Sequence, residues 1–91
     1  MKKLKSLNNY SVEEVKKEIS KQLGYDVSKI RLFGSRIIGG YTKNSDLDIA
    51  VLDEKKCLDE IEPFYINVFK MKGEIHYVDS FDTSILKLIS A

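Results

Sequence analysis

Two short apolar segments, each joined to a small polar motif, constrain the fold of this 91-residue chain more than any other feature. The first, residues 30–33, ends in Gly34-Ser35, and the second, residues 46–52, begins Asp46-Leu47-Asp48 before becoming continuously apolar. A short apolar run bounded by turn residues is typical of a buried strand. We therefore expect one strand that ends in a tight turn and a second strand whose start faces a cleft.

A helix is expected before these strands, over residues 12–23. There Ser11 and Glu14 form a capping box, apolar residues recur at helical spacing, and Gly24 stops the run. Between the two strands, residues 35–45 are polar and contain Gly39-Gly40, which predicts a short helix or a loop.

The third part of the chain gives mixed signals. Over residues 54–72 apolar side chains recur at helical spacing, yet Pro63 interrupts them and Phe64-Tyr65-Ile66 favours a strand. We expect a kinked helix there, with a β-hairpin through Lys72-Gly73 as the alternative. A strand over residues 74–79 and a closing helix over residues 83–90 complete the expected fold.

Composition excludes several classes of protein. The chain has 15 basic and 14 acidic residues, so no overall charge bias points to nucleic acid, which leaves that partner open. Cys57 is the only cysteine and cannot form an internal disulfide; with one histidine, a Cys/His zinc cluster is excluded. The apolar runs are too short to span a bilayer. We expect a single domain over residues 1–91, located in the cytoplasm.

Asp46 and Asp48 are the first candidates for chemistry. Side chains at i and i+2 of a strand point the same way, so the two carboxylates can share one or two divalent cations, and oxygen ligands select Mg²⁺ or Mn²⁺. Gly34-Ser35 adds to this motif, because a glycine at a strand end allows close backbone approach and the following N–H groups and hydroxyl can bind phosphate. The combination predicts a nucleoside triphosphate beside metal.

The segments Leu32-Phe33-Gly34-Ser35-Arg36 and Ser45-Asp46-Leu47-Asp48-Ile49 resemble the minimal nucleotidyltransferases of the polymerase-β-type superfamily. The resemblance implies an α/β (α+β) domain with a small mixed sheet and helices packed on one side. It also implies that Asp46 and Asp48 ligate metal and act in catalysis. The residues expected to bind nucleotide are Gly34, Ser35, Arg36 and Ser45.

The family's third carboxylate is replaced in this chain. Its position aligns with His76 in Glu74-Ile75-His76-Tyr77-Val78-Asp79. His76 can act as a metal ligand or general base, although imidazole is a poor ligand for Mg²⁺. Glu74 lies on the same strand face and is the alternative, whereas Asp79 would face away.

Two functions follow from the resemblance. The first is a Mg²⁺-dependent transfer of AMP from ATP to a hydroxyl of a partner protein, similar to antitoxins that adenylylate an all-helical HEPN-type toxin. The alternative is a catalytically weak nucleotide-binding subunit that neutralises such a partner by binding. A chain of 91 residues has no room for a separate acceptor-binding domain, so a partner or a second copy of the chain would present the acceptor.

Overall fold

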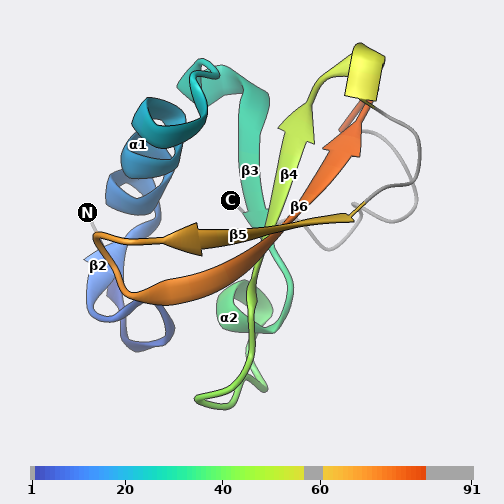
Figure 1. The fold of residues 1–91 in the computed structure, drawn as a ribbon. Helices are drawn as coiled ribbons and strands as arrows, with labels where there is room; N and C mark the ends of the chain where they lie inside the picture. The colour runs from blue at the N-terminus through green and yellow to red at the C-terminus, as the bar shows by residue number, and fades with distance from the viewer. Residues whose placement is uncertain (1, 57–60, 82–91) are drawn as a thin grey trace.

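A four-stranded sheet forms the centre of the molecule in a computed structural model that describes residues 2–56 and 61–81 (Figure 1). The strands lie in the order β3-β4-β6-β5. Their bounds are β3 Ile30–Phe33, β4 Leu47–Leu52, β5 Ile61–Ile66 and β6 Met71–Val78. Strand β4 runs parallel to β6 and antiparallel to β3, and β5 runs antiparallel to β6. The small mixed sheet expected from the sequence is therefore confirmed.

Helix α1 (Val12–Leu23) lies on one face of this sheet and begins and ends as the sequence predicts. The Ser11 hydroxyl accepts from the Glu14 N–H, and the Glu14 carboxylate accepts from the Ser11 N–H at 3.0 Å. Gly24 ends the helix with a φ of 81°, in the left-handed region. The hydrogen bond from the Lys3 ammonium group is the largest cause that lowers the pKa of Glu14 to about 2, and the two hydrogen bonds with Ser11 lower it further.

The remaining short elements surround the sheet. They are β1 (Lys3–Leu4), β2 (Tyr10–Ser11), α2 (Ser35–Ile38) and the 3-10 turns η1 (Lys5–Leu7), η2 (Val27–Lys29) and η3 (Glu54–Lys56). Helix α2 is the short helix expected within residues 35–45. Among the described residues, the helices are too short and polar to cross a membrane.

Alternation along β4 and β6 separates a core face from an opposite, site-bearing face. Leu47, Ile49 and Val51 of β4 are fully buried, as is Ile75 of β6, and they pack with Val15 and Ile19 of α1. The intervening Asp48, Glu74 and His76 are only half-buried. The hydrophobic effect thus fixes the register that presents these three polar side chains on the face away from α1.

The helix expected over residues 54–72 is wrong for the part of it that is described. After η3, residues 61–66 form β5 instead, because strand propensity and pairing with β6 prevail over helical spacing. Pro63 fits this assignment, since β5 lies at the sheet edge, where a residue without an N–H is tolerated. Within the expected helix, residues 57–60 lie outside the described part, and so does the whole of the closing helix at 83–90.

The β-hairpin alternative is correct in kind but not in the place of its turn. The chain turns at residues 67–70, where Lys70 takes a φ of 51°, rather than at Lys72-Gly73. Gly73 lies inside β6, and a Cβ atom there would come within 3.1 Å of the Leu47 carbonyl oxygen and 3.2 Å of the Ile49 side chain. Gly73 is therefore explained by the close approach of β4, not by a turn.

Candidate metal and nucleotide site

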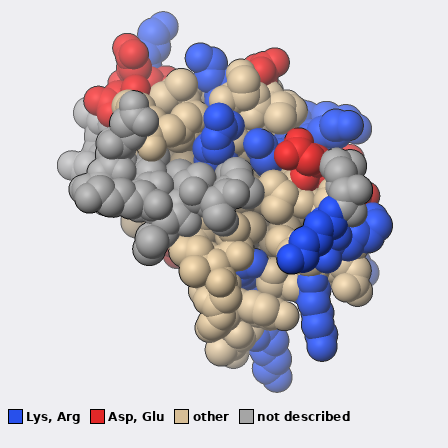
Figure 2. All heavy atoms as spheres, turned by 180° about the vertical axis from the view of Figure 1, so that it is seen from behind, with Lys and Arg blue, Asp and Glu red and all other residues tan. Residues whose placement is uncertain are grey.

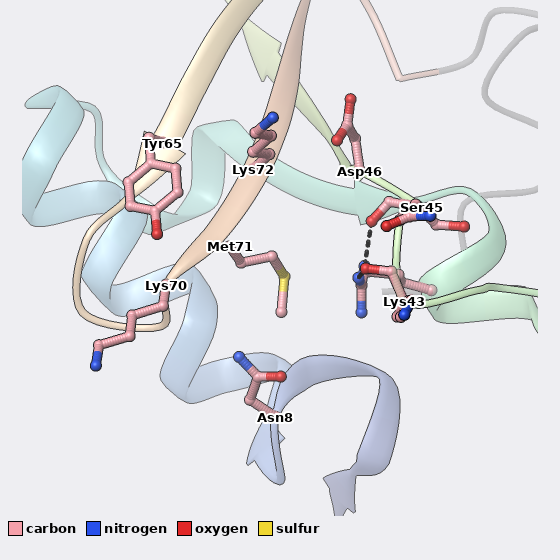
Figure 3. Close-up of a pocket in the computed structure, with 10 residues that line it drawn as sticks. Asn8, Lys43, Ser45, Asp46, Tyr65, Lys70, Met71 and Lys72 are labelled. Carbon is pink, nitrogen blue, oxygen red and sulfur yellow. Dashed lines mark hydrogen bonds between the residues drawn. The ribbon is translucent and has the colours of Figure 1, made fainter.

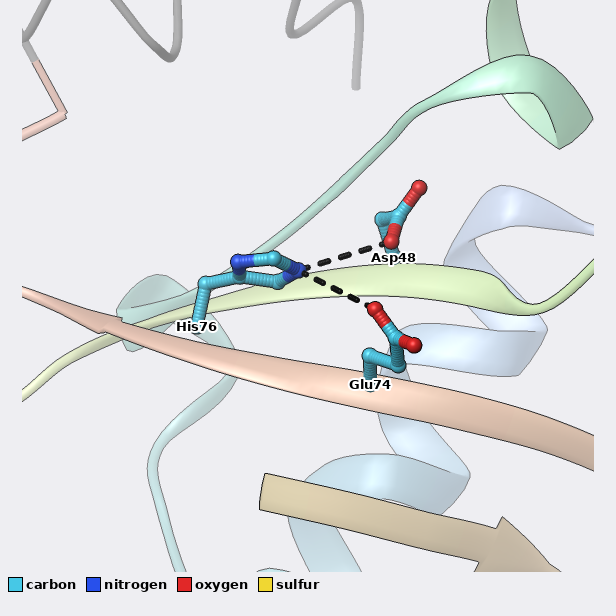
Figure 4. A group of neighbouring side chains, drawn as sticks. All are labelled: Asp48, Glu74 and His76. Carbon is cyan, nitrogen blue, oxygen red and sulfur yellow. Dashed lines mark ion pairs between the residues drawn. The ribbon is translucent and has the colours of Figure 1, made fainter. Parts of the chain in front are cut away.

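Three side chains converge between β4 and β6 on the face away from α1. Asp48 pairs in register with Glu74, and His76 lies two residues further along β6 on the same face. The His76 Nε2 atom is 3.4 Å from Asp48 Oδ1 and 3.9 Å from Glu74 Oε2 (Figure 4). One ligand atom from each of the three residues lies within 4.8 Å of the other two. This acidic cluster of Asp48, Glu74 and His76 has the spacing of a cation site.

Gly34 covers the acidic cluster from the end of β3. Phe33 pairs with Asp48, and Gly34 follows with φ 86° and ψ −169°, a conformation that is essentially restricted to glycine. A Cβ atom at this position would lie 2.0 Å from Asp48 Oδ2. Any side chain here would collide with the carboxylate, so glycine is needed for the backbone to pass directly over Asp48.

The electrostatics of the cluster favour a bound cation. Burial raises the pKa of Asp48, and the nearby charge of Asp46 raises it further, while His76 opposes both. His76 Nε2 is buried and has no hydrogen-bond partner among the described residues, and Phe33 packs edge-on against its ring at 5.0 Å. A ring nitrogen that makes no hydrogen bond while it faces two carboxylates fits a metal ligand. The donor set of two carboxylates and one imidazole therefore fits a divalent metal ion.

Asp46 lies outside this cluster as the described residues are arranged. It comes directly before β4 and lines a hollow of about 610 Å³, which none of the three cluster residues lines (Figure 3). Its negative charge still raises the pKa of Asp48, so the two carboxylates interact electrostatically. The sharing of a cation by Asp46 and Asp48 stays a prediction.

The expected nucleotide-binding residues other than Gly34 belong to α2 and to the loop before Asp46. Ser35 opens α2 directly after Gly34 and is half-buried. The Ser45 hydroxyl accepts from the Thr42 N–H at 2.9 Å and closes a turn before Asp46. Arg36 is 9% exposed, and its Nε donates to the Ser45 carbonyl at 2.7 Å.

The other two ends of the Arg36 guanidinium also meet backbone carbonyl groups. Nη1 donates to Ser6, and Nη2 donates to Lys43 at 3.4 Å. Arg36 thus joins the N-terminal turn to the loop that carries Ser45, and it positions the loop instead of projecting into solvent.

Sequence reasoning missed the lysines that surround the hollow beside Asp46. Lys70 and Lys72 reach it only because β5 and β6 form a hairpin, which the expected helix over residues 54–72 concealed. Pro63 followed by Phe64-Tyr65-Ile66 was the signal that could have revealed this hairpin. Of the residues proposed for the third ligand position, Glu74 joins the cluster beside His76, whereas Asp79 follows β6 and is exposed.

Comparison with protein-family models supports the geometry. Residues 8–91 match the model of a family described as polymerase beta, nucleotidyltransferase. Searches of curated proteins and of solved structures found no match. The family match covers nearly the whole chain and includes both Gly34-Ser35 and Asp46-x-Asp48. The chain therefore belongs to the polymerase beta nucleotidyltransferase family.

Proposed function

We propose that this protein is a divalent-metal-dependent nucleotidyltransferase that transfers AMP from ATP to a hydroxyl group of a partner protein. The observation that carries the proposal is the acidic cluster beneath Gly34. There, a buried imidazole nitrogen that makes no hydrogen bond within the described residues faces two carboxylates, in a chain of the nucleotidyltransferase family. Mg²⁺ or Mn²⁺ is the cation proposed, with ATP as substrate, and we place the reaction in the cytoplasm.

Each motif has a role in this proposal. Asp46 and Asp48 would bind the metal together with Glu74 or His76, and the metal would supply charge neutralisation for the triphosphate. The N–H groups after Gly34 and the Ser35 hydroxyl would bind phosphate oxygens. Ser45 and Arg36 would act on nucleotide through the loop before Asp46, which they order in the structure.

Transfer requires one bond to form and one to break at the α-phosphorus. The acceptor hydroxyl oxygen bonds to this phosphorus, the bond to the bridging oxygen breaks, and pyrophosphate leaves with that oxygen. The hydroxyl proton must go to a base on the protein. Glu74 and His76 both lie beside Asp48 and are the two candidates for that base.

The partner we propose is a helical HEPN-type protein, so that the chain would act as the antitoxin of a pair. In this proposal the partner presents the acceptor hydroxyl, and a second copy of the chain is another way to complete the acceptor site.

A second candidate function is a nucleotide-binding subunit that neutralises its partner without efficient transfer. The specific observation in its favour is His76, which stands where the family's third acid is expected and brings a neutral, softer donor to the cluster. Loss of this acid would impair transfer more than triphosphate binding.

Label transfer from ATP radiolabelled at the α-phosphorus distinguishes the two functions. With the partner and Mg²⁺ or Mn²⁺ present, the transferase reading predicts label on the partner, and Asp46→Asn and Asp48→Asn each remove it. Both replacements keep side-chain shape, and unchanged melting temperatures would show that a loss of label does not come from unfolding. Metal-dependent ATP binding without label would support the binding subunit, and unchanged binding in both Asn variants would refute the site.

A further inference from the structure

The hollow beside Asp46 is lined by none of the three residues of the acidic cluster. It has a volume of about 610 Å³, within the range of pockets that bind nucleotide-sized ligands. Figure 3 shows Tyr65 and Lys70 on one side and Lys43, Ser45 and Asp46 on the other, with Met71 and Asn8 between them. Because its walls come from four segments far apart in the sequence, the hollow depends on the folded arrangement.

Specific polar contacts order the walls of this hollow. The Asn8 side-chain amide donates to the Phe69 carbonyl at 2.6 Å, which ties the N-terminal turn to the β5–β6 turn. Asn8 and Lys70 both have left-handed backbone conformations, with φ of 54° and 51°. On the opposite wall, Arg36 bonds the carbonyl groups of residues 43 and 45. The hollow is therefore enclosed by ordered backbone rather than by free loops.

The hollow carries more positive than negative side chains along its walls. Lys43, Lys70 and Lys72 line it, and none of the three ammonium groups pairs with a carboxylate within residues 2–56 and 61–81. Asp46 is the acidic residue that lines it. On the face shown in Figure 2, acidic and basic side chains lie together in the upper part, whereas the lowest part shows charged side chains of the basic kind alone. The lysines thus form a local anion-binding arrangement in a chain of nearly neutral charge.

The register of the hairpin connects this basic hollow to the acidic cluster. Cross-strand partners share a face, and the pairs His76–Ile61, Glu74–Pro63 and Lys72–Tyr65 follow one another along β6 and β5. A second hollow of about 440 Å³ lies along this row and is lined by Asp46, Tyr65, Lys72 and Glu74, among others. Tyr65 is 48% exposed and lines both hollows.

We propose that these two hollows form a site for a second nucleotide unit, with its phosphates on Lys43, Lys70 and Lys72 and its base against Tyr65. The ligand is a 5′-phosphorylated nucleotide, either free or at the end of a single strand, since aromatic stacking with flanking lysines is how single strands are bound without sequence readout. This unit is distinct from the acceptor of the proposed function, which is a hydroxyl group of a partner protein. Its binding does not require that function.

Fluorescence anisotropy of a short, 5′-phosphorylated and dye-labelled single strand tests the site in EDTA, where metal-dependent ATP binding plays no part. The variant Lys43→Gln/Lys70→Asn/Lys72→Gln removes the three positive charges, and Asn at position 70 tolerates the left-handed backbone. The control Lys17→Gln/Lys29→Gln/Lys55→Gln removes three charges from exposed lysines outside the hollow. We expect about tenfold or greater weakening in the first variant, a salt slope reduced by about two, and little change in the control.

Tyr65 provides a test that does not depend on charge. Tyr65→Phe keeps the ring and should bind normally, whereas Tyr65→Ala should weaken binding about fivefold or more. Repeating the titration with free 5′-AMP as competitor shows whether a single nucleotide suffices or a strand is needed. Equal weakening in the two lysine triples, or Tyr65→Ala binding like wild type, would overturn the proposal. Displacement of the strand by inorganic triphosphate but not by 5′-AMP would instead assign the lysines to the tail of ATP.

Discussion

Asp48 and Asp46 are two residues apart, yet the regions around them have opposite electrostatic character. Asp48 lies under the backbone of Gly34, beside Glu74 and His76, where burial raises its pKa. Asp46 opens onto the hollow lined by Lys43, Lys70 and Lys72. The first region is suited to a cation and the second to an anion. In the proposed function, the strand start would therefore hold a metal ion and a phosphate group next to each other, as nucleotidyl transfer requires.

Replacing Gly34 with Ala should affect the Asp48 region most strongly. The new Cβ would occupy the position of the Asp48 carboxylate, so metal-dependent ATP binding should weaken at least about tenfold through the displaced ligand. Gly39→Ala is the matched control, because Gly39 has a similar backbone conformation, φ 123° and ψ 169°, but no atom within 4 Å of its Cβ position. Calorimetric titration of both variants separates the collision from backbone strain. Equal loss in the two would contradict the close approach of Gly34 to Asp48.

Arg36→Lys tests whether the loop before Asp46 is ordered by the guanidinium group. Lysine cannot reach three separate carbonyl groups, so the variant should lose roughly 1–3 kcal/mol of stability, seen as a melting temperature lower by about 5–15 °C. Arg31→Lys serves as the control, because the hydrogen bonds described for Arg31 go to carbonyl groups nearby in sequence, those of Ser28 and Ile30. Its contact with the distant Phe81 ring, at 4.7 Å, is of a kind that an ammonium group also makes. Similar melting temperatures for the two variants would show that Arg36 does not join the two segments.

His76→Asp should change which metal the acidic cluster prefers. With an imidazole donor, the native protein should bind ATP better with Mn²⁺ than with Mg²⁺, whereas a third carboxylate should narrow that difference by several-fold. Titrations with each metal measure the ratio directly, and label transfer measured in parallel shows whether the acid also restores chemistry. If the ratio does not change, His76 Nε2 is not a ligand.

Asp46→Asn and Asp48→Asn should have different effects on the basic hollow. Removing the Asp46 charge should strengthen binding of the labelled single strand about two- to fivefold in EDTA, because Asp46 lines the hollow with the lysines. The Asp48→Asn protein should bind the strand like wild type, since Asp48 lies in the acidic cluster instead. If both replacements strengthen binding of the single strand to the same degree, the acidic cluster and the basic hollow are not electrostatically distinct.

The sequence was sufficient to predict secondary structure wherever local propensity and the pattern of apolar residues agreed. The capping box of Ser11 and Glu14, the strand ending at Gly34 and the strand after Asp46 could all be predicted, because propensity and apolar pattern point the same way there. Residues 61–66 could not, because helical spacing and strand propensity conflict and the outcome depends on pairing with β6.

The same conflict explains what was missed in the candidate site. The lysines at 70 and 72 and Tyr65 come together only across the hairpin, so no linear motif marks them. The role of Arg36 was also missed. Its position after Gly34-Ser35 suggests a phosphate contact, whereas in the folded chain its guanidinium group donates to three carbonyl groups of distant segments.

The most direct test of the central claim is calorimetric titration of ATP into the purified protein, with Mn²⁺, with Mg²⁺ and in EDTA. The acidic cluster predicts binding that requires a divalent metal and that disappears in Asp48→Asn. ATP binding of equal strength in EDTA, or binding that survives in Asp48→Asn, would contradict a metal and nucleotide site at Asp48.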